Sequence, residues 1–471
     1  LPGAGGTQRA PRLAGMAFAL DMITTGRQIG AEEALKHGLI DTLQDGSDPR
    51  EAAITAARAL QNGILPMRRT GEIEVAPDPD ALAAARARVE SARPRLYSPA
   101  RAIDAVEASA LPLDQGLARE RALYLDCQAS PQRAGLVHAF FAERAVSKVP
   151  EAAETPRPTD HIGVIGAGTM GSGIATAALL AGCRVTLVER AQEALERGRA
   201  TIARNLDGAE KRGKLDPAGR AGAEARLAMA TEMTALSEAD VIVEAAFEDM
   251  EVKRGIFTTL DQVAKPGAVL ATNTSYLDVN RIADATRRPE DVLGLHFFSP
   301  AHVMRLLEVV VADRTAPDAV ATGFALAKRL RKVAVRAGVC DGFIGNRVMA
   351  AWRKAADYLL MDGADFDRID RALEDFGFAM GPFAVSDLAG LDIGWAARKR
   401  RAPTRPTEER YVPIADRICE EGWFGRKTGR GFYLHEAGQP PRPNSDAQAI
   451  VAAERHAAGI TPRDFTDDEI V

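Results

Sequence analysis

The chain has 471 residues, too many for one compact core, so its length predicts two to four domains. Its 65 acidic and 60 basic residues give a formal net charge of -5, which argues against a nucleic-acid-binding protein, because such a protein needs a basic surface. The four cysteines lie far apart without metal-ligand spacing, and no window offers the roughly 18 to 20 consecutive apolar residues of a membrane helix. We therefore expect a cytoplasmic protein with reduced thiols, no bound metal and no membrane span.

The first 155 residues are predicted to be largely helical. A glycine-rich turn precedes apolar residues at helical spacing, and the stretch 30–41 predicts a short helix, a stop at Gly38 and a brief strand. Residues 1–65 are predicted to form the first domain. Residues 66–155 are alanine-rich and then interrupted by prolines, which favours a helical linker.

Short apolar runs separated by helical segments follow this linker. Such runs are typical of buried parallel strands, and they lie at 162–165, 185–188, 241–243, 268–271 and 292–295. Strands that alternate with helices predict an α/β domain over 156–338, built on a parallel sheet with helices on both faces. The strand signals then fade, so residues 339–471 are predicted to form an all-helical domain.

A glycine motif follows the first apolar run. Residues 166–171 fit the pattern GxGxxG, which is weak alone because the chain holds 41 glycines. Here the motif directly follows a strand and opens a helical segment, as in a Rossmann-type domain. Gly166 would make the tight turn, Gly168 would let the backbone approach a pyrophosphate, and Gly171 would allow close helix–strand packing. The free N–H groups of the helix N-terminus would bind the phosphates.

A carboxylate at the end of the second predicted strand indicates which dinucleotide is bound. Glu189 follows Gly171 by 18 residues, where a ribose-binding carboxylate is expected. It can accept hydrogen bonds from the ribose hydroxyls and would repel a 2′-phosphate, which favours NAD over NADP. Arg190 leaves the alternative open, because an arginine at this place can pair with that phosphate.

A histidine ends the fifth predicted strand. His296 follows the run 292–295, at the edge where parallel α/β sheets bind their ligands. There it can act as the base that removes a hydroxyl proton while hydride leaves the same carbon. Glu308 follows twelve residues later and would fix the tautomer of the imidazole and stabilise its charged form. Viewed alone, His296 could equally be a structural histidine.

The segment HFFSPAHVMRLLEVV at 296–310 resembles the catalytic segment of the 3-hydroxyacyl-CoA dehydrogenases, in which HFFNP…EV carries a His–Glu dyad. Further matches to that family occur in the same order. They are GAGTMGSGIA at 166–175, VEAAFEDMEVK at 243–253, TNTSYL at 272–277, DGFIGNR at 341–347, GPFAVSDLAGLD at 381–392 and GRKTGRGFY at 425–433. Seven motifs in one order argue against a chance match.

The resemblance implies catalytic and substrate-binding roles. His296 and Glu308 would form the catalytic dyad. Ser275 would lie near both the substrate and the nicotinamide, and Asn346 would hold the substrate oxygen.

The resemblance also implies cofactor contacts. Met170, Glu189, Glu248 and Lys253 would contact the dinucleotide, in addition to Ser275 and the three glycines. The chain departs from the family pattern at two places. A serine, residue 299, replaces the usual Asn of HFFNP, and a glutamate stands at 189 where aspartate is commoner.

The N-terminal sequence resembles a second family. LPGAGGTQRAPRLAG at 1–15 and TGRQIGAEEALKHGLID at 25–41 are similar to the crotonase family, in its stretch after the second catalytic glutamate. Both glutamates of that family would lie upstream of Leu1, so we expect 1–65 to be a truncated remnant of an enoyl-CoA hydratase domain without hydratase activity. We also expect both ends of the chain to be cut, the second one where a further helical repeat would begin.

The order of crotonase end, helical linker and dehydrogenase resembles the multifunctional fatty-acid oxidation enzymes. The predicted function is therefore the oxidation of (3S)-3-hydroxyacyl-CoA to 3-ketoacyl-CoA with NAD in β-oxidation. The predicted partners are an acyl-CoA thioester and either a second copy of the chain or a thiolase.

Two alternatives to this function stay open. One is a non-catalytic NAD-binding or interaction chain, which the intact pair of His296 and Glu308 argues against. The other is a β-hydroxyacid dehydrogenase for free acids, whose lysine base would stand on the helical domain, where Asn346 occupies the corresponding helix start.

Overall fold

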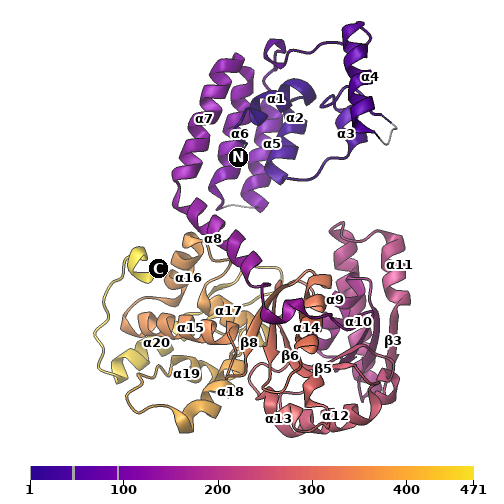
Figure 1. The fold of residues 1–471 in the computed structure, drawn as a ribbon. Coiled ribbons are helices and arrows are strands. Elements are labelled where there is room, and N and C mark those ends of the chain that lie inside the picture. The colour runs from indigo at the N-terminus through magenta and orange to yellow at the C-terminus, as the bar shows by residue number, and fades with distance from the viewer. Residues whose placement is uncertain (1, 45–47, 93–94) are drawn as a thin grey trace. The chain divides into compact units, whose positions relative to one another are not determined.

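The computed structural model describes residues 2–44, 48–92 and 95–471 and divides into two compact units, Leu1–Phe141 and Ala142–Val471 (Figure 1). The described part of the first unit is helical. Its helices are α1 (Gly6–Ala14), α2 (Met16–Thr25), α3 (Ala31–Lys36), α4 (Pro49–Gln61), α5 (Pro79–Ala92), α6 (Tyr97–Glu107), α7 (Leu113–Ala129) and the start of α8 (Pro131–Ala145).

The first unit is built around one small core. Helices α1, α2, α5, α6 and α7 pack on one another, and α2, α5 and α6 contribute a cluster of buried apolar side chains, Met16, Leu20, Ala85, Ile103 and Val106. Helices α5 and α6 come from the range predicted as a linker, yet they share this core with a helix of the predicted first domain. The predicted domain boundaries at 65, 155 and 338 stay predictions.

The first unit contains the predicted glycine-rich turn but lacks the strand predicted after Gly38. The glycine-rich turn is held by the buried carboxylate of Glu120, which accepts hydrogen bonds from the backbone N–H groups of Gly5 (2.6 Å) and Thr7 (3.0 Å). The prediction of a brief strand after Gly38 is wrong. Residues 39 and 40 form bends, and an isolated strand without a paired neighbour is not stable in water.

The second unit contains the predicted Rossmann-type sheet. Eight strands of its described residues pair in the order β3-β2-β1-β4-β5-β6-β7-β8. They are β1 (His161–Ile165), β2 (Arg184–Val188), β3 (Leu227–Ala230), β4 (Val241–Glu244), β5 (Val269–Thr272), β6 (Val292–Phe297), β7 (Leu306–Val311) and β8 (Val333–Gly338). This arrangement confirms the predicted fold class.

One pair of strands departs from the predicted parallel arrangement. Strand β7 runs antiparallel to β6, whereas the other neighbouring strands pair in parallel. The cause is the short connection over 298–305, because a parallel crossover needs a dozen or more residues. The reversal places His296 directly opposite Glu308 in the register of the two strands.

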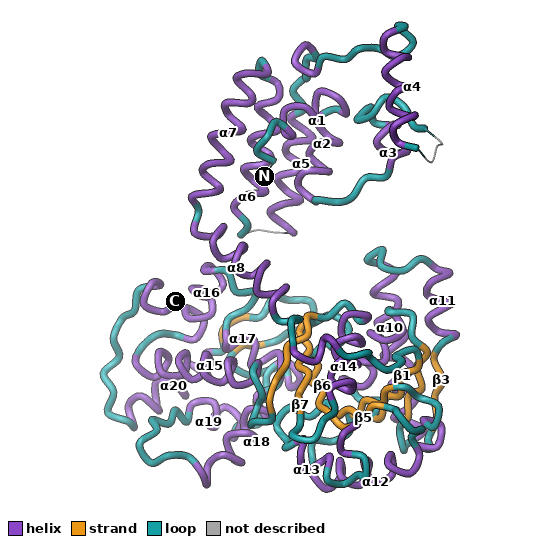
Figure 2. The backbone as a smooth tube through the Cα atoms, viewed as in Figure 1, coloured by secondary structure: helices purple, strands orange, loops and turns teal. Residues whose placement is uncertain are grey.

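Helices cover both faces of the sheet (Figure 2). They are α9 (Thr169–Leu180), α10 (Gln192–Lys211), α11 (Pro217–Ala225), α12 (Met250–Val263), α13 (Val279–Ala283) and α14 (Pro317–Arg329). Alternate strand residues enter two separate cores. In β4, for example, Val241 and Val243 join one cluster and Ile242 the other. Burial on both faces explains why these strands are continuous apolar runs.

The chain ends in a helical domain with one small hairpin. Its helices are α15 (Gly345–Asp362), α16 (Phe366–Phe376), α17 (Pro382–Ala389), α18 (Leu391–Arg401), α19 (Ile414–Glu420), α20 (Ser445–Ala457) and α21 (Asp467–Ile470), and the hairpin pairs β9 (Tyr433–Leu434) with β10 (Arg442–Pro443). The large rings of Phe366, Phe383 and Phe432 fill its core. Among the residues that the structure describes, none of the helices has the length and apolar character of a membrane span.

Two of the family-like motifs meet inside this helical domain. Asp387, from the first of them, is fully buried and accepts hydrogen bonds from the backbone N–H groups of Phe432 (3.0 Å) and Tyr433 (2.9 Å) and from His435 Nε2 (3.0 Å). A Cβ on Gly431 would lie 2.3 Å from the Asp387 carboxylate, so the glycine of the second motif leaves room for this oxygen. These two motifs therefore have a structural explanation.

Candidate active site

Most of the predicted site residues gather at the carboxyl edge of the sheet. Gly166 follows β1, Glu189 follows β2, Ser275 lies just beyond β5, and His296 is the fifth residue of β6. Because β1, β2, β5 and β6 are parallel, their carboxyl ends meet at one edge. Segments that are far apart in sequence thus form one site.

The glycine loop after β1 has the shape that a dinucleotide needs. Gly166 has a φ of 98°, and an added Cβ would lie 2.7 Å from the backbone oxygen of Ala245. A Cβ on Gly171 would lie 1.8 Å from the backbone oxygen of Gly166, so helix and strand are in close contact there. At Gly168 the added Cβ would meet open space, directly before the N-terminus of α9. The glycine loop therefore leaves room for a pyrophosphate at Gly168, next to the N-terminus of α9.

Glu189 lies beside this loop. Its side chain is half-buried, and its Oε2 accepts a hydrogen bond from the backbone N–H of Ala167 at 3.1 Å. Met170 is half-buried and packs on the core of the sheet, and Arg190 is exposed. The carboxylate thus lies at the loop where a ribose hydroxyl would bind.

The His–Glu pair has the geometry of a dyad. His296 is 3% exposed and Glu308 is fully buried, and Nδ1 of His296 lies 2.6 Å from Oε2 of Glu308. The ring of Phe298 lies against the imidazole, with the ring centres 4.5 Å apart. If Glu308 is ionised, Nδ1 must donate in this bond, which leaves Nε2 as the nitrogen that can accept a proton.

The surroundings of Glu308 favour its ionised form. Burial alone raises the pKa of Glu308, but the hydrogen bond from His296 and those from the backbone N–H groups of Gly345 (2.7 Å) and Ile344 (3.0 Å) outweigh it, so the pKa lies below its ordinary value. These two N–H groups belong to the start of α15, whose N-terminus carries a partial positive charge.

Asn346 follows the two residues that bind Glu308. It is the second residue of α15. Gly345 is required at this point, because an added Cβ would lie 2.7 Å from the ring of Phe298. The preceding Phe343 is fully buried with a φ of 47°, a conformation that non-glycine residues rarely adopt and that marks a constrained turn.

Ser275 lies in a turn that another predicted residue holds. Oε1 of Glu248 accepts hydrogen bonds from the hydroxyl of Thr274 (2.6 Å) and from the backbone N–H groups of Ser275 (2.8 Å) and Tyr276 (3.2 Å). The turn is also joined to strand β6, which bears His296, since Oδ1 of Asn273 accepts from the backbone N–H of Phe297 at 2.8 Å. Asn273 was not among the site residues predicted from the sequence.

Lys253 was predicted to contact the cofactor, but its side chain does not face open space. It is 1% exposed, and its ammonium lies between the carboxylates of Glu244 (2.8 Å) and Glu248 (3.4 Å). Sequence analysis missed Glu244, although a charged residue at the end of a buried apolar strand is a visible signal. A contact between Lys253 and the dinucleotide stays a prediction.

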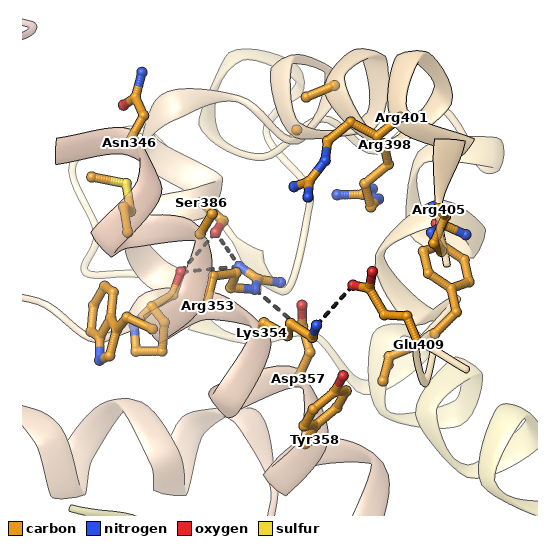
Figure 3. Close-up of a pocket in the computed structure, with 18 of the residues that line it drawn as sticks. Asn346, Arg353, Lys354, Asp357, Tyr358, Ser386, Arg398, Arg401, Arg405 and Glu409 are labelled. Atoms are coloured by element: carbon orange, nitrogen blue, oxygen red, sulfur yellow. Dashed lines mark hydrogen bonds and ion pairs between the residues drawn. The ribbon is translucent and has the colours of Figure 1, made fainter. Parts of the chain in front are cut away.

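A cavity of about 340 Å³ begins at Asn346 and follows one face of α15 (Figure 3). Along that helix its lining includes Ala350, Arg353 and Asp357, which lie three or four residues apart and therefore on one side. The facing wall comes from α18 and the following loop, with Arg398, Arg401, Arg405 and Glu409. An adjoining cavity of about 500 Å³ shares Asn346, Ala350 and Tyr276 with the first.

The chain matches three known protein domains. Residues 161–340 match the NAD binding domain of 3-hydroxyacyl-CoA dehydrogenase, residues 342–435 match the C-terminal domain of the same enzyme, and residues 1–83 match enoyl-CoA hydratase/isomerase. With the glycine loop and the His–Glu pair, these matches define an NAD-dependent 3-hydroxyacyl-CoA dehydrogenase, an oxidoreductase of fatty-acid β-oxidation.

Relatives show the particular family. The chain is 40% identical over 494 residues to the peroxisomal bifunctional enzyme of Danio rerio, covering all of this chain and 68% of that protein. It is 35% identical to the peroxisomal fatty acid beta-oxidation multifunctional protein AIM1 of Arabidopsis thaliana, covering 67% of that protein. The chain belongs to this family of bifunctional enzymes, which combine enoyl-CoA hydratase and 3-hydroxyacyl-CoA dehydrogenase domains.

Solved structures agree with this assignment. The (S)-3-hydroxybutyryl-CoA dehydrogenase PaaH1 of Ralstonia eutropha matches with a TM-score of 0.56 and 32% identity, covering 59% of this chain and 100% of that one. The dehydrogenase part of multifunctional enzyme 1 of C. elegans matches with a TM-score of 0.53 and 26% identity, covering 70% of this chain and 77% of that one. The predicted absence of hydratase activity and the predicted cytoplasmic location stay predictions.

Proposed function

We propose that His296 is the general base that removes the proton of the 3-hydroxyl group. Its Nε2 accepts this proton, while Glu308 holds Nδ1 and stabilises the imidazolium that forms. The glycine loop and Glu189 would hold NAD, which would supply the acceptor for the hydride of C3, so that the product would be the 3-ketoacyl-CoA. The 2.6 Å contact between His296 and Glu308, from strands paired in exact opposition, is the observation that carries this proposal.

Ser275 and Asn346 position the substrate in this proposal. Ser275 lies on the turn after β5 and Asn346 on the first turn of α15, so the two approach the dyad from the sheet and from the helical domain. Two polar side chains from different elements fix the direction of the C3–oxygen bond, and this orientation supplies much of the rate. The partner proteins, a second copy or a thiolase, stay predictions.

The roles of these two side chains are tested by substitution. Ser275→Ala and Asn346→Ala each lower kcat with (3S)-3-hydroxybutyryl-CoA by about 10- to 100-fold, because the oxygen is no longer oriented. Ser237→Ala, a half-buried serine near the opposite edge of the sheet, keeps the wild-type rate. NADH absorbance at saturating NAD is the measurement. A wild-type rate in both site variants would contradict the assignment.

The cavity along α15 accommodates the acyl chain in this proposal, because Trp352 and Val385 supply apolar lining between its charged groups. Asn346 lines the start of the cavity, so a substrate held at its oxygen by Asn346 can extend its chain along the helix. Ala350→Trp fills the space shared by both cavities and lowers kcat/KM for long-chain substrates far more than for 3-hydroxybutyryl-CoA. Ala355→Trp, exposed on the same helix and outside both linings, is the matched control. Equal losses at all chain lengths would place the acyl chain elsewhere.

A further inference from the structure

A lysine is buried where general electrostatics disfavours it. Lys253 lies in the first turn of α12 and is 1% exposed. An ammonium loses its hydration on burial, and the positive end of a helix dipole adds repulsion. The compensation is Glu244, whose two oxygens lie 2.8 and 2.9 Å from the Lys253 nitrogen. We therefore expect the buried pair of Lys253 and Glu244 to have a role other than filling space in the core.

Glu244 connects three elements at the carboxyl edge of the sheet. It ends β4, binds Lys253 of α12, and accepts a hydrogen bond from the hydroxyl of Thr272 at the end of β5 (2.7 Å). Its Oε1 also accepts the backbone N–H of Ala246 at 2.7 Å. The carboxylate is fully buried, so each of these contacts is sheltered from water.

The network continues from Lys253 to the turn that bears Ser275. The Lys253 nitrogen lies 3.4 Å from Oε2 of Glu248, and the other oxygen of Glu248 accepts from the N–H groups of Ser275 and Tyr276. The pair thus orients the carboxylate that shapes this turn.

A second connection reaches the catalytic strand. The backbone N–H of Asn273 donates to the backbone oxygen of Glu244 at 2.7 Å, and its side-chain oxygen accepts from Phe297, the residue after His296. The turn over 273–276 is therefore joined at one end to Phe297, the neighbour of His296, and at the other end, through Glu248, to the buried pair.

We propose that Glu244 is a positioning residue for the dehydrogenase. Acting through Lys253 and Glu248, it sets the place of Ser275 relative to His296. The inference rests on the substrate-positioning role proposed above for Ser275. It assigns to Glu244 a function in catalysis without contact to the substrate.

The same strand offers a matched control. Asp240 directly precedes β4, and its side chain binds Lys265, which follows α12, at 2.7 Å. It also accepts backbone N–H groups, from Asp160 (2.9 Å) and His161 (2.8 Å). Asp240 and Glu244 thus lie at opposite ends of β4, and the carboxylate of each accepts a backbone N–H group and pairs with a lysine. Asp240 lies away from the carboxyl edge.

The test compares Glu244→Gln with Asp240→Asn in the full chain. Glu244→Gln keeps the shape but removes the charge, and kcat at saturating NAD and substrate falls about 10- to 100-fold, more than either KM changes. Asp240→Asn lowers the unfolding midpoint while kcat per folded molecule stays at the wild-type value. In the Ser275→Ala background Glu244→Gln adds little further loss, because both act on one group.

Two results would contradict a positioning role for Glu244. A wild-type kcat in Glu244→Gln, or losses that multiply in the double variant, would overturn it. If Glu244→Gln does not fold, Glu244→Gln/Lys253→Met removes both charges together, which buried pairs often tolerate, and the same loss of kcat is expected. A normal rate in Ser275→Ala would instead refute the proposed role of Ser275, independently of Glu244.

Discussion

The helical domain and the sheet each contain a histidine paired with a buried carboxylate. His296 binds Glu308 at 2.6 Å, and His435 binds Asp387 at 3.0 Å. Both carboxylates are fully buried, and each accepts two backbone N–H groups. By residue types and contacts, the two pairs are close equivalents.

The two pairs differ in where they lie and in the direction in which the pKa of the carboxyl group is shifted. Burial raises the pKa of Asp387, although hydrogen bonds from Tyr433, His435 and Phe432 oppose it. Burial also acts on Glu308, but there its hydrogen-bond partners prevail and the pKa is lowered. Glu308 also lies opposite His296 at the carboxyl edge of the sheet, whereas Asp387 joins α17 to the segment that begins the hairpin. Residue types alone therefore do not separate the proposed catalytic pair from a structural one, whereas the place in the fold and the direction of the pKa shift do.

The comparison is tested most strongly by removing each imidazole. His296→Gln lowers kcat by about 10²- to 10⁴-fold, the usual contribution of a positioned general base, and keeps NAD binding. His435→Gln leaves kcat per folded molecule near wild type, because its partner has a structural role. Steady-state NADH formation and NAD titration measure both. A near-normal kcat in His296→Gln would remove the distinction between the pairs.

The second largest expected effect is a loss of unfolding free energy in the structural pair. Asp387→Ala leaves the backbone N–H groups of Phe432 and Tyr433 buried without an acceptor, which costs about 2 to 4 kcal/mol of unfolding free energy. Denaturant unfolding of the full chain measures this loss. The kcat of the remaining folded molecules should stay near wild type. A loss of kcat larger than the loss of folded protein would show that Asp387 also serves the site.

A third carboxylate, Glu189, tests whether location at the sheet edge is enough to predict function. We expect kcat/KM to be at least about tenfold higher with NAD than with NADP, about 1.4 kcal/mol in transition-state free energy. Glu189→Ala should narrow this gap, because ribose hydrogen bonds are lost and Arg190 can then accept a 2′-phosphate. Both cofactors are measured on both proteins. An unchanged ratio in the variant would mean that Glu189 is not the ribose ligand.

The smallest effect is a difference in pH dependence. The pKa of Glu308 is lowered on folding, so its stabilising contribution is present above the unfolded value of about 4.3 and is lost as the pH falls through the folded value. The pKa of Asp387 is raised, so its contribution is present below about 3.9 and is lost as the pH rises through the folded value. The stability differences between wild type and Glu308→Gln or Asp387→Asn should therefore change with pH in opposite directions, as unfolding curves between pH 3 and 7 would show. Parallel slopes would contradict the opposite pKa shifts of Glu308 and Asp387.

Local sequence alone determined much of the fold and part of the site. The strands β1, β2, β4, β5 and β6 were predictable because burial on both faces makes each an uninterrupted apolar run. Strand β3 was not, because its residues are only partly buried at the edge of the sheet. The glycine loop and His296 were also predictable, since each carries its chemistry within a few consecutive residues.

Only the tertiary structure decided the partners of these residues. The short connection after β6 reversed β7 and brought Glu308 opposite His296, and the hydrogen bonds from His296 and from the start of α15 together lowered the pKa of that carboxyl group. In the same way the burial of Lys253 between Glu244 and Glu248 follows from the packing of α12 beside β4 and β5. A sequence states which groups are present, but distance, burial and ionisation arise between segments far apart in the chain, and these decide which group acts on which.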